Sequence, residues 1–427
     1  MSPTDIRHQP SCADPVDTSR ALSVDEAREM ILAGIRPLAG YEKLPIRSAL
    51  GRYLAESVVS PVDVPAHRNS AMDGFAIRGS EIPPEGESAE FRCVGTVLAG
   101  HPFDGEVGPG ECVQIMTGAP VPDVLDTVVM QEQAEYDGQM VRIGGRHKPG
   151  QNVRQAGEDL ARGGVVFSPG RKITAADLGV VASLGIAELR VRRRPVVAFF
   201  STGDELRSIG EPLGEGEIYD SNRYTLYGML TELGVELLDM GVVADDPEAM
   251  EAAFSTAAQV ADLILTSGGV SVGEADYIKP VLESLGEITF WKIKMKPGRP
   301  LTFGRLGNAT FVGLPGNPVA VMVAFHQFVL PALQYMMSGR QPQPMLLKAI
   351  ATEPIRKRPG RTEFARGIFH LDADGLKVAT TGQQGSGILT SMSRANCYIV
   401  LPPAQGQVAV GDEVTIQPFV SLAATAT

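Results

Sequence analysis

The chain has 427 residues, a net charge of −12 at pH 7 and a hydrophobic fraction of 44%. This length suits roughly three domains, and the acidic balance argues against nucleic-acid binding as the main role. The 4 cysteines form no C-x-x-C pair and the 6 histidines are scattered, so we expect free thiols in a reducing cytoplasm and no histidine-ligated transition metal.

Residues 1–20 are polar and lack the apolar run of a signal peptide. Ser23 and Glu26 form a capping box, which predicts that a helix begins there. Helical sequence resumes after a strand-rich stretch, so we expect a split helical domain made of residues 21–60 and 150–192.

The intervening residues 61–149 contain short apolar segments separated by Gly and Pro, which predicts an inserted, antiparallel β domain. Two of its loops carry polar side chains that could serve a site, Asp73 and Thr117. Each loop alone is better explained as a structural turn, because Asp-Gly and Gly-Ala-Pro are common at corners.

The second half of the split domain contains the loop Gly157-Glu158-Asp159 and then a second capping box, formed by Thr174 and Asp177. We expect this box to begin a helix that ends near Gly185.

Strands and helices alternate from Pro195 onward, which predicts a doubly wound α/β domain over residues 193–338. Asn317 is expected to cap its last helix, with Pro318 at the first helical position. That helix is apolar but contains His326, so we expect a buried helix and no membrane span. The tail, residues 342–427, has short β segments and is expected to form a β-barrel.

Polar and glycine residues follow four strand ends of the α/β domain. They are Glu205, Asp245, the group Ser267, Gly268, Gly269, Ser271 and Asp276, and the segment Leu314-Pro315-Gly316-Asn317-Pro318. Parallel strands end at one edge of a sheet, so these loops are expected to line one crevice. Amide-rich loops beside carboxylates suit a Mg²⁺ ion bridging carboxylate and phosphate, whereas a tight turn before an acidic helix start is the alternative.

A run of cations follows in the segment Trp291–Lys296. Strand periodicity places Lys292, Lys294 and Lys296 on one face, and Arg299 follows in the next turn. A solvated edge strand would explain them, but a local oxyanion or phosphate site fits better in an acidic protein.

Several reaction classes are disfavoured. The sequence contains no P-loop motif, no G-x-G-x-x-G after a first strand and no obvious pair of nucleophile and histidine base. The reaction classes that still fit the carboxylates, glycine loops and lysines are phosphoanhydride chemistry and oxyanion transfer.

The chain resembles the MoeA family of molybdopterin molybdenumtransferases, whose eukaryotic relative is the gephyrin E domain. The resemblance spans nearly all of the chain after residue 20. It is carried by N-S-A-M-D-G-F-A at 69–76, M-T-G-A-P at 116–120, G-E-D at 157–159, S-T-G-D-E-L at 201–206, S-G-G-V-S-V-G-E-A-D-Y at 267–277 and L-P-G-N-P at 314–318.

The resemblance implies insertion of molybdate into adenylylated molybdopterin with release of AMP, supported by Mg²⁺. It also implies a homodimer whose site is shared between the subunits, with possible handover of substrate from the adenylyltransferase, and no nucleic-acid or membrane partner. A molybdopterin adenylyltransferase and a non-catalytic dimeric scaffold are the alternatives.

The resemblance also implies residue roles. Glu205, Asp245 and Asp276 would handle Mg²⁺ and the anhydride, and Asp73 would act catalytically from the partner subunit. The substrate-binding set would be Thr117, Asp159, Ser267, Gly268, Gly269, Ser271, Lys292, Lys296, Pro315, Asn317, Pro318, Arg366 and Ser386. The chain departs from the family pattern at His67, Arg68, Arg299 and Gly387, which leaves fine substrate handling open.

Overall fold

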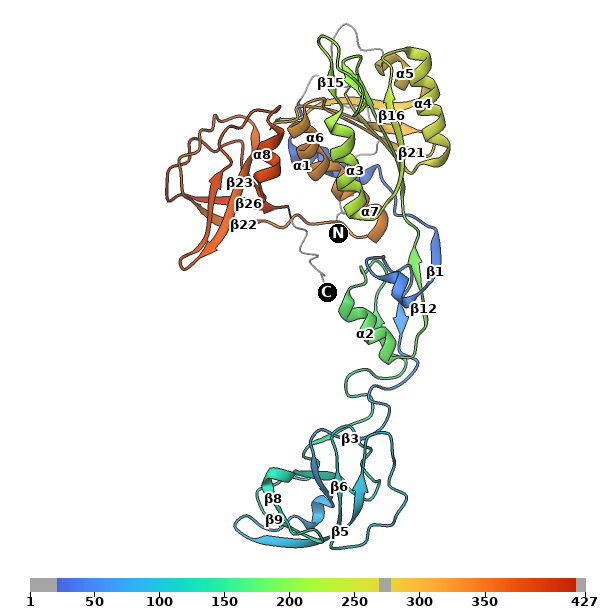
Figure 1. Ribbon diagram of the computed structural model, residues 1–427, viewed down its shortest axis with the longest axis vertical. Coiled ribbons are helices and arrows are strands. Elements are labelled where there is room, and N and C mark those ends of the chain that lie inside the picture. The colour runs from blue at the N-terminus through green and yellow to red at the C-terminus, as the bar shows by residue number, and fades with distance from the viewer. Residues whose placement is uncertain (1–20, 269–277, 420–427) are drawn as a thin grey trace, which may run out of the picture. The chain divides into compact units, whose positions relative to one another are not determined.

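The computed structural model describes residues 21–268 and 278–419. The described chain divides into two compact units. Unit 1 contains residues 21–42, 51–53 and 191–419, and unit 2 contains residues 43–50 and 54–190 (Figure 1).

Unit 1 is built on a mixed six-stranded sheet with the order β16-β13-β17-β21-β20-β18. The first four strands are parallel, while β20 runs antiparallel to both of its neighbours. The strands are β16 (Glu236–Val243), β13 (Val196–Thr202), β17 (Leu263–Ser267), β21 (Ala309–Leu314), β20 (Pro300–Leu306) and β18 (Gly286–Lys292).

Helices cover both faces of this sheet, as in a doubly wound fold (Figure 1). Val197 and Phe199 of β13 point into one core, and Ala198 and Phe200 point into the other. The first core is closed by α1 (Val24–Ala33), α3 (Ser221–Leu233), α6 (Pro318–Ala324) and α7 (Leu330–Ser338), and the second by α4 (Pro247–Val260) and α5 (Ile278–Leu285).

Helix α1 begins at the predicted capping box of Ser23 and Glu26. Its fully buried residues Ala27 and Ile31 belong to the core of the α/β domain, and Arg28 Nη2 donates to Gln327 Oε1 at 2.9 Å. By packing, this helix therefore lies in the core of unit 1, while the split helical domain of residues 21–60 and 150–192 stays a prediction.

The helical stretch from Pro318 to Ser338 has a π-helical turn, Phe325–Val329, between α6 and α7. Its length and composition would allow it to cross a membrane, but 72% of its apolar window is buried inside the protein. The stretch therefore serves as a core helix of unit 1, as predicted.

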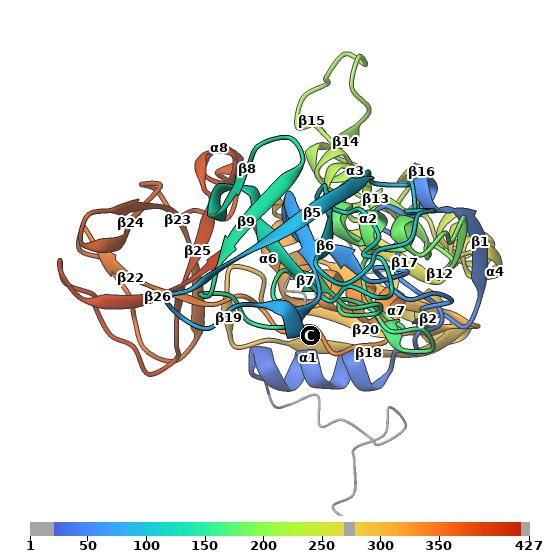
Figure 2. The same cartoon turned by 90° about the horizontal axis from the view of Figure 1, so that it is seen from below.

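The C-terminal part of unit 1 is a closed five-stranded barrel (Figure 2). Its strands follow the order β23-β24-β22-β26-β25, and a further β23–β25 pairing closes the ring. They are β22 (Leu347–Ala351), β23 (Thr362–Asp372), β24 (Gly375–Thr380), β25 (Cys397–Leu401) and β26 (Glu413–Pro418), accompanied by the short helix α8 (Leu389–Arg394). The two-residue strand β19 (Met295–Lys296) pairs with β23 from outside the ring.

Unit 2 contains a six-stranded sheet with the order β7-β4-β6-β5-β9-β8. Most pairings are antiparallel, as predicted, but β5 and β6 are parallel. The strands are β4 (Gly74–Ile77), β5 (Ser88–Val97), β6 (Glu111–Ile115), β7 (Thr127–Met130), β8 (Ala134–Tyr136) and β9 (Met140–Gly144).

The rest of the described chain in unit 2 has one α-helix, α2 (Ala175–Ser183), which begins at the predicted Thr174–Asp177 capping box. The other elements there are short paired strands, so this region is less helical than expected. They are β2 (Val58–Val59) with β11 (Val165–Phe167) and β3 (Asn69–Ser70) with β10 (Val153–Arg154).

Candidate functional site

The carboxyl ends of the parallel strands lie side by side at one edge of the sheet in unit 1. Ser201 of β13 is in register with Ser267 of β17, which is in register with Leu314 of β21. Strand β18 is separated from β21 by one antiparallel strand, so Lys292, its last residue, lies at the same edge. The sheet therefore places the predicted loops next to one another.

Gly268 lies in close contact with the ends of both neighbouring strands. Its φ of +95° lies in the left-handed region, and a Cβ there would be 2.5 Å from the carbonyl oxygen of Thr202. Its amide donates to the carbonyl of Leu314 at 3.2 Å. A side chain at this position would therefore separate the ends of β13 and β17.

Among the described residues, several buried polar atoms without a hydrogen-bond partner lie on elements at this edge, and three of them follow strand ends or begin α3. They are Thr202 Oγ1, Asp220 Oδ2 and Asn222 Oδ1. Asn222 is fixed through its Nδ2, which donates to the carbonyl of Gly316 at 2.7 Å. Buried polar atoms normally have partners, so these are candidate ligand contacts.

The sequence analysis missed Asn222. The segment Asp220-Ser221-Asn222 is typical of a helix start, and Asp220 does cap α3 by accepting from the amide of Arg223 at 3.1 Å. The available signal was the position of Asn222, at a helix start facing the glycine-rich loops.

Carboxylates gather where β13 and β16 end. Burial raises the pKa of Asp245, and the nearby charges of Asp204 and Glu205 raise it further. Mutual repulsion of this kind is relieved by a hard cation with oxygen ligands, so Glu205 and Asp245 fit Mg²⁺ chemically.

The metal site is incomplete within the described chain. These residues contain no group of three or more His, Cys, Asp or Glu side chains that could hold a metal ion. Asp276, the third predicted ligand, lies outside the described residues, as do Gly269 and Ser271.

The segment Leu314-Pro315-Gly316-Asn317-Pro318 leads from β21 into α6. Pro315 is buried, whereas Asn317 is exposed. Asn317 occupies the N-cap position, but its side chain makes no capping hydrogen bond, which corrects our expectation. Next to Pro318, the Val319 amide donates to the carbonyl of Ser386 at 3.1 Å, which brings the barrel to this loop.

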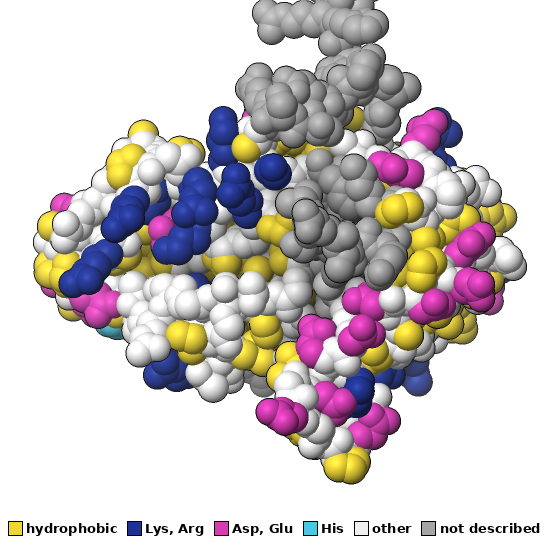
Figure 3. Space-filling view, turned by 90° about the horizontal axis from the view of Figure 1, so that it is seen from above, with side chains coloured by type: hydrophobic (Ala, Val, Ile, Leu, Met, Phe, Trp, Pro, Cys, Tyr) yellow, Lys and Arg dark blue, Asp and Glu magenta, His cyan; other side chains and the backbone are white. Residues whose placement is uncertain are grey.

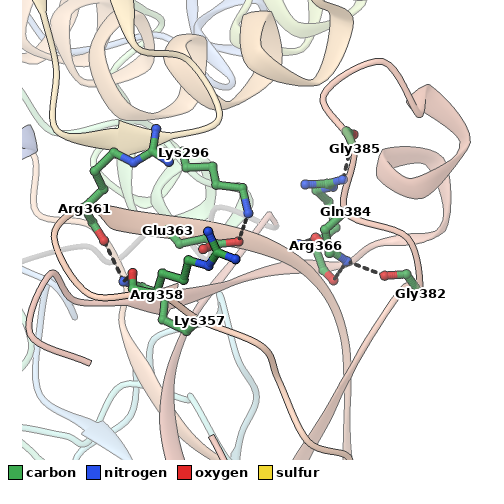
Figure 4. A network of polar contacts seen from close by, with 9 residues as sticks. All are labelled: Lys296, Lys357, Arg358, Arg361, Glu363, Arg366, Gly382, Gln384 and Gly385. Atoms are coloured by element: carbon green, nitrogen blue, oxygen red, sulfur yellow. Dashed lines mark hydrogen bonds and ion pairs between the residues drawn. The ribbon is translucent and has the colours of Figure 1, made fainter. Parts of the chain in front are cut away.

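Arg366 lies in the barrel and is only 1% exposed. Its Nη2 donates to the carbonyl of Gly385 at 2.9 Å, and its amide donates to Gln384 Oε1 at 2.8 Å (Figure 4). Its Nε donates to Ser391 Oγ at 3.0 Å. Burial lowers its pKa. The guanidinium is therefore fixed against the carbonyl of Gly385, the residue that precedes Ser386.

Lys292, Lys294 and Lys296 are all exposed, and the residues between them, Ile293 and Met295, are buried. The predicted alternation is therefore present, although the lysines do not share one strand. Strand β18 ends at Lys292, while β19 joins the sheet of the barrel. The Nζ of Lys296 lies 2.7 Å from Glu363 Oε1.

The remaining predicted residues lie on unit 2. Asp73 Oδ1 accepts hydrogen bonds from the Thr117 amide at 2.6 Å and from Thr117 Oγ1 at 2.7 Å. These bonds, led by the backbone one, lower the pKa of Asp73. Asp159 is exposed on a loop between β10 and β11.

The four departures from the family pattern occupy different settings. Arg68 lies 3.6 Å from Asp123, and the backbone carbonyl of Arg299 accepts from the amide of Ile293 at 2.7 Å. A Cβ at Gly387 would meet no atom within 4 Å. His67 is exposed.

Comparison with known proteins shows the family. A protein of Haemophilus influenzae named molybdopterin molybdenumtransferase is 42% identical over 402 residues, which cover 93% of this chain and 98% of that protein. The chain belongs to the MoeA family. Family models match along its length: "MoeA N-terminal region (domain I and II)" at 22–185, "Probable molybdopterin binding domain" at 198–335 and "MoeA C-terminal region (domain IV)" at 348–419.

Other MoeA relatives agree. A Nostoc protein named molybdopterin molybdenumtransferase is 34% identical and covers 88% of each chain. Gephyrin of Dictyostelium discoideum is 33% identical over 92% of this chain and 61% of its own length. The crystal structure of the molybdopterin biosynthesis MoeA protein from Pyrococcus horikoshii OT3 matches with a TM-score of 0.82 at 30% identity, covering 94% of this chain and 100% of that one.

Proposed function

We propose that this protein transfers molybdenum to molybdopterin, and that its substrates are molybdate and adenylylated molybdopterin, with AMP as the leaving product. The names of its full-length relatives support the reaction class. The observation that best supports this function is a row of neighbouring loops along one edge of the sheet in unit 1. It runs from Asp245 through Ser267 and Gly268 to Ser386 and Arg366 in the barrel.

The two ends of this edge suit different parts of the substrate. Lys296 and the rigid Arg366 provide cationic donors for a tetrahedral oxyanion. Gly268 lets a phosphate or pterin group approach the backbone closely. We place Ser267, Pro315, Asn317 and Pro318 between the two ends, because they follow the strands that end there.

We assign Mg²⁺ to the carboxylate end, held by Glu205 and Asp245 together with Asp276. When bound, the ion would neutralise charge on the phosphoanhydride. The protein's own carboxylates orient and balance that charge, and the raised pKa of Asp245 fits a group that needs a cation beside it.

We further propose a cytoplasmic homodimer with a shared site, in which Asp73, Thr117 and Asp159 act from the partner subunit. Thr117 keeps the Asp73 carboxylate ionised and oriented. An adenylyltransferase would hand over the substrate.

The test is incubation with adenylylated molybdopterin, Mg²⁺ and molybdate, following AMP release. We expect molybdate-dependent AMP release from the wild type, and at least a hundredfold less from Asp245→Asn and Lys296→Ala. Glu413→Gln, in an exposed ion pair of the barrel, is the matched control and should be unaffected. Adenylylation of molybdopterin from ATP, without AMP release, would instead support the adenylyltransferase alternative.

A further inference from the structure

Glu363 is a buried carboxylate within the basic end of the proposed site. The residue is 8% exposed, and it lies at the start of β23 in register with Lys296 of β19. Its Oε1 accepts from Lys296 Nζ at 2.7 Å. The lysine side chain remains 46% exposed, whereas the glutamate side chain is 11% exposed. The carboxylate therefore lies beneath the ammonium group.

Further cations surround this carboxylate. Lys357 is 7% exposed, and its Nζ donates to the carbonyls of Arg358 and Arg361 at 2.9 and 2.8 Å. Burial lowers the pKa of Lys357, the charge of Glu363 opposes that shift, and the charges of Lys296 and Arg361 add to it. Glu363 therefore lies among four cationic side chains with which it interacts electrostatically (Figure 4). They are Lys296, Lys357, Arg361 and Arg366.

This cluster of Lys and Arg side chains around Glu363 is a local basic region on a protein whose net charge is −12. Lys and Arg side chains gather on the barrel side of one face, and many Asp and Glu side chains lie on the other side of the same view (Figure 3). Even with Glu363 ionised, the cationic groups outnumber it, so the local potential stays positive. Glu363 lowers that potential without cancelling it.

We propose that Glu363 sets how tightly the site holds its oxyanion, because its negative charge offsets one unit of the positive charge of Lys296, Lys357, Arg361 and Arg366. This role rests on the proposed function, because it assumes an oxyanion bound at Lys296 and Arg366. The carboxylate keeps the ground-state affinity moderate. Tight ground-state binding would lower KM for molybdate without raising kcat, and would slow the transfer of the bound anion.

The role has an electrostatic signature. A carboxylate acts on a bound anion in proportion to the anion's charge. Removing it should therefore change the binding free energy of a dianion about twice as much as that of a monoanion of similar shape. Molybdate and perrhenate form such a pair, since both are tetrahedral oxyanions, carrying two charges and one charge respectively.

The experiment is equilibrium dialysis of molybdate and of perrhenate against wild type and Glu363→Gln, with elemental analysis of the bound anion. Glutamine keeps the size and an acceptor for Lys296 but removes the charge. We expect molybdate to bind about tenfold more tightly and perrhenate about threefold more tightly. In turnover, KM for molybdate should fall while kcat does not rise.

Two further variants serve as a control and as an independent test of the electrostatic effect. Glu413→Gln removes a carboxylate from another lysine pair of the barrel, Lys348–Glu413 at 3.1 Å, and should change neither affinity. Arg361→Gln removes an exposed cation of the cluster and should act in the opposite direction, with the same two-to-one ratio of free energies. It keeps the proposal testable if Glu363→Gln fails to fold.

The outcomes separate this role from the proposed function. If the wild type binds molybdate but Glu363→Gln leaves its affinity unchanged or weakens it, or shifts both anions by the same factor, the role of Glu363 is overturned alone. If the wild type binds no molybdate, and Lys296→Ala and wild type release AMP equally, the proposed site fails and this role fails with it.

Discussion

Gly268 holds a backbone conformation that other residues rarely adopt, at the contact between two strand ends. We expect Gly268→Ala to destabilise unit 1 by about 1–3 kcal/mol, because both the positive φ and the Thr202 carbonyl oppose a Cβ. Denaturation in urea, followed by the fluorescence of the single tryptophan, Trp291, measures this directly.

Gly228 is the matched control for that substitution. It lies in α3 without a positive φ, and a Cβ added there would meet no atom within 4 Å, so Gly228→Ala should stabilise the same unit by about 0.5–1 kcal/mol. Equal effects of the two alanines would contradict the role given to Gly268.

The two hydrogen bonds from Thr117 to Asp73 lead to a second prediction at the residue scale. Thr117→Val removes the hydroxyl donor but keeps the backbone one, so the pKa of Asp73 should rise part of the way toward its ordinary value. Carboxyl NMR titration measures this shift. If Asp73 acts as a carboxylate, the acid limb of the activity profile should move to higher pH.

Thr117→Ser retains the hydroxyl and is the control for this change. A Thr117→Val protein whose Asp73 titrates as in the wild type would show that the backbone amide alone sets the pKa.

Single residues differ in how far the sequence revealed them. Gly268 was predictable, because a glycine at the carboxyl end of a parallel strand indicates a close approach. Glu363 was not, because its partner Lys296 is 67 residues away and only the β19–β23 register joins them.

At the scale of elements, the helical stretch from Pro318 to Ser338 carries a titratable group at its contact with the barrel. His326 lies in the π-helical turn, its Nδ1 is 2.8 Å from the Tyr398 hydroxyl, and its ring also contacts Phe419. Burial lowers the pKa of His326 to about 4. The helix and the barrel therefore meet around a neutral imidazole.

This burial predicts a pH dependence of stability. The unfolded histidine takes up its proton near pH 6.5, before the folded one does, so stability is complete above that pH and falls as the pH drops toward 4. We expect a loss of roughly 3 kcal/mol across this window. Urea denaturation at a series of pH values measures it.

His326→Phe should remove this component, while His370→Gln, at an exposed site on β23, should leave it in place. Identical slopes for wild type and His326→Phe would refute the assignment.

Helix starts could be predicted where they depend on residues close together in the sequence, whereas the packing of a helix could not. The capping boxes at Ser23 and Thr174 depend on residues three positions apart, and both formed. The predicted Asn317 cap was right in position but wrong in its contact, since the Asn317 side chain makes no hydrogen bond to the start of α6. The packing of α1 could not be read locally, since its partners lie near residue 327.

At the scale of the molecule, the proposed function assigns residues of both units to a site that two subunits would share. If unit 2 of one subunit completes the site of its partner, Asp73→Asn and Lys296→Ala should complement each other. Each variant alone should be inactive, whereas a re-associated equal mixture should regain roughly a quarter of wild-type activity, because half of the dimers would carry one intact site. AMP release measures the recovery.

A mixture of Lys296→Ala with Asp245→Asn is the control, because both changes lie in unit 1 and every mixed dimer would keep two damaged sites. No recovery in the first mixture would contradict the shared site.

The closed barrel shows why the whole molecule was harder to predict than its parts. Short β segments indicated a barrel, but closure depends on the β23–β25 pairing between residues at least 30 positions apart. Hydrophobic alternation alone does not fix such a register.

Strand β19 has a practical consequence for anyone who divides this protein. Residues 295 and 296 precede the linker that joins α7 to β22, residues 339–346, yet they pair with β23 of the barrel. A chain cut at that linker would strip β23 of its neighbour and expose His326 and its aromatic surroundings to water. Grafting the C-terminal module onto another scaffold would therefore require transplanting this dipeptide as well.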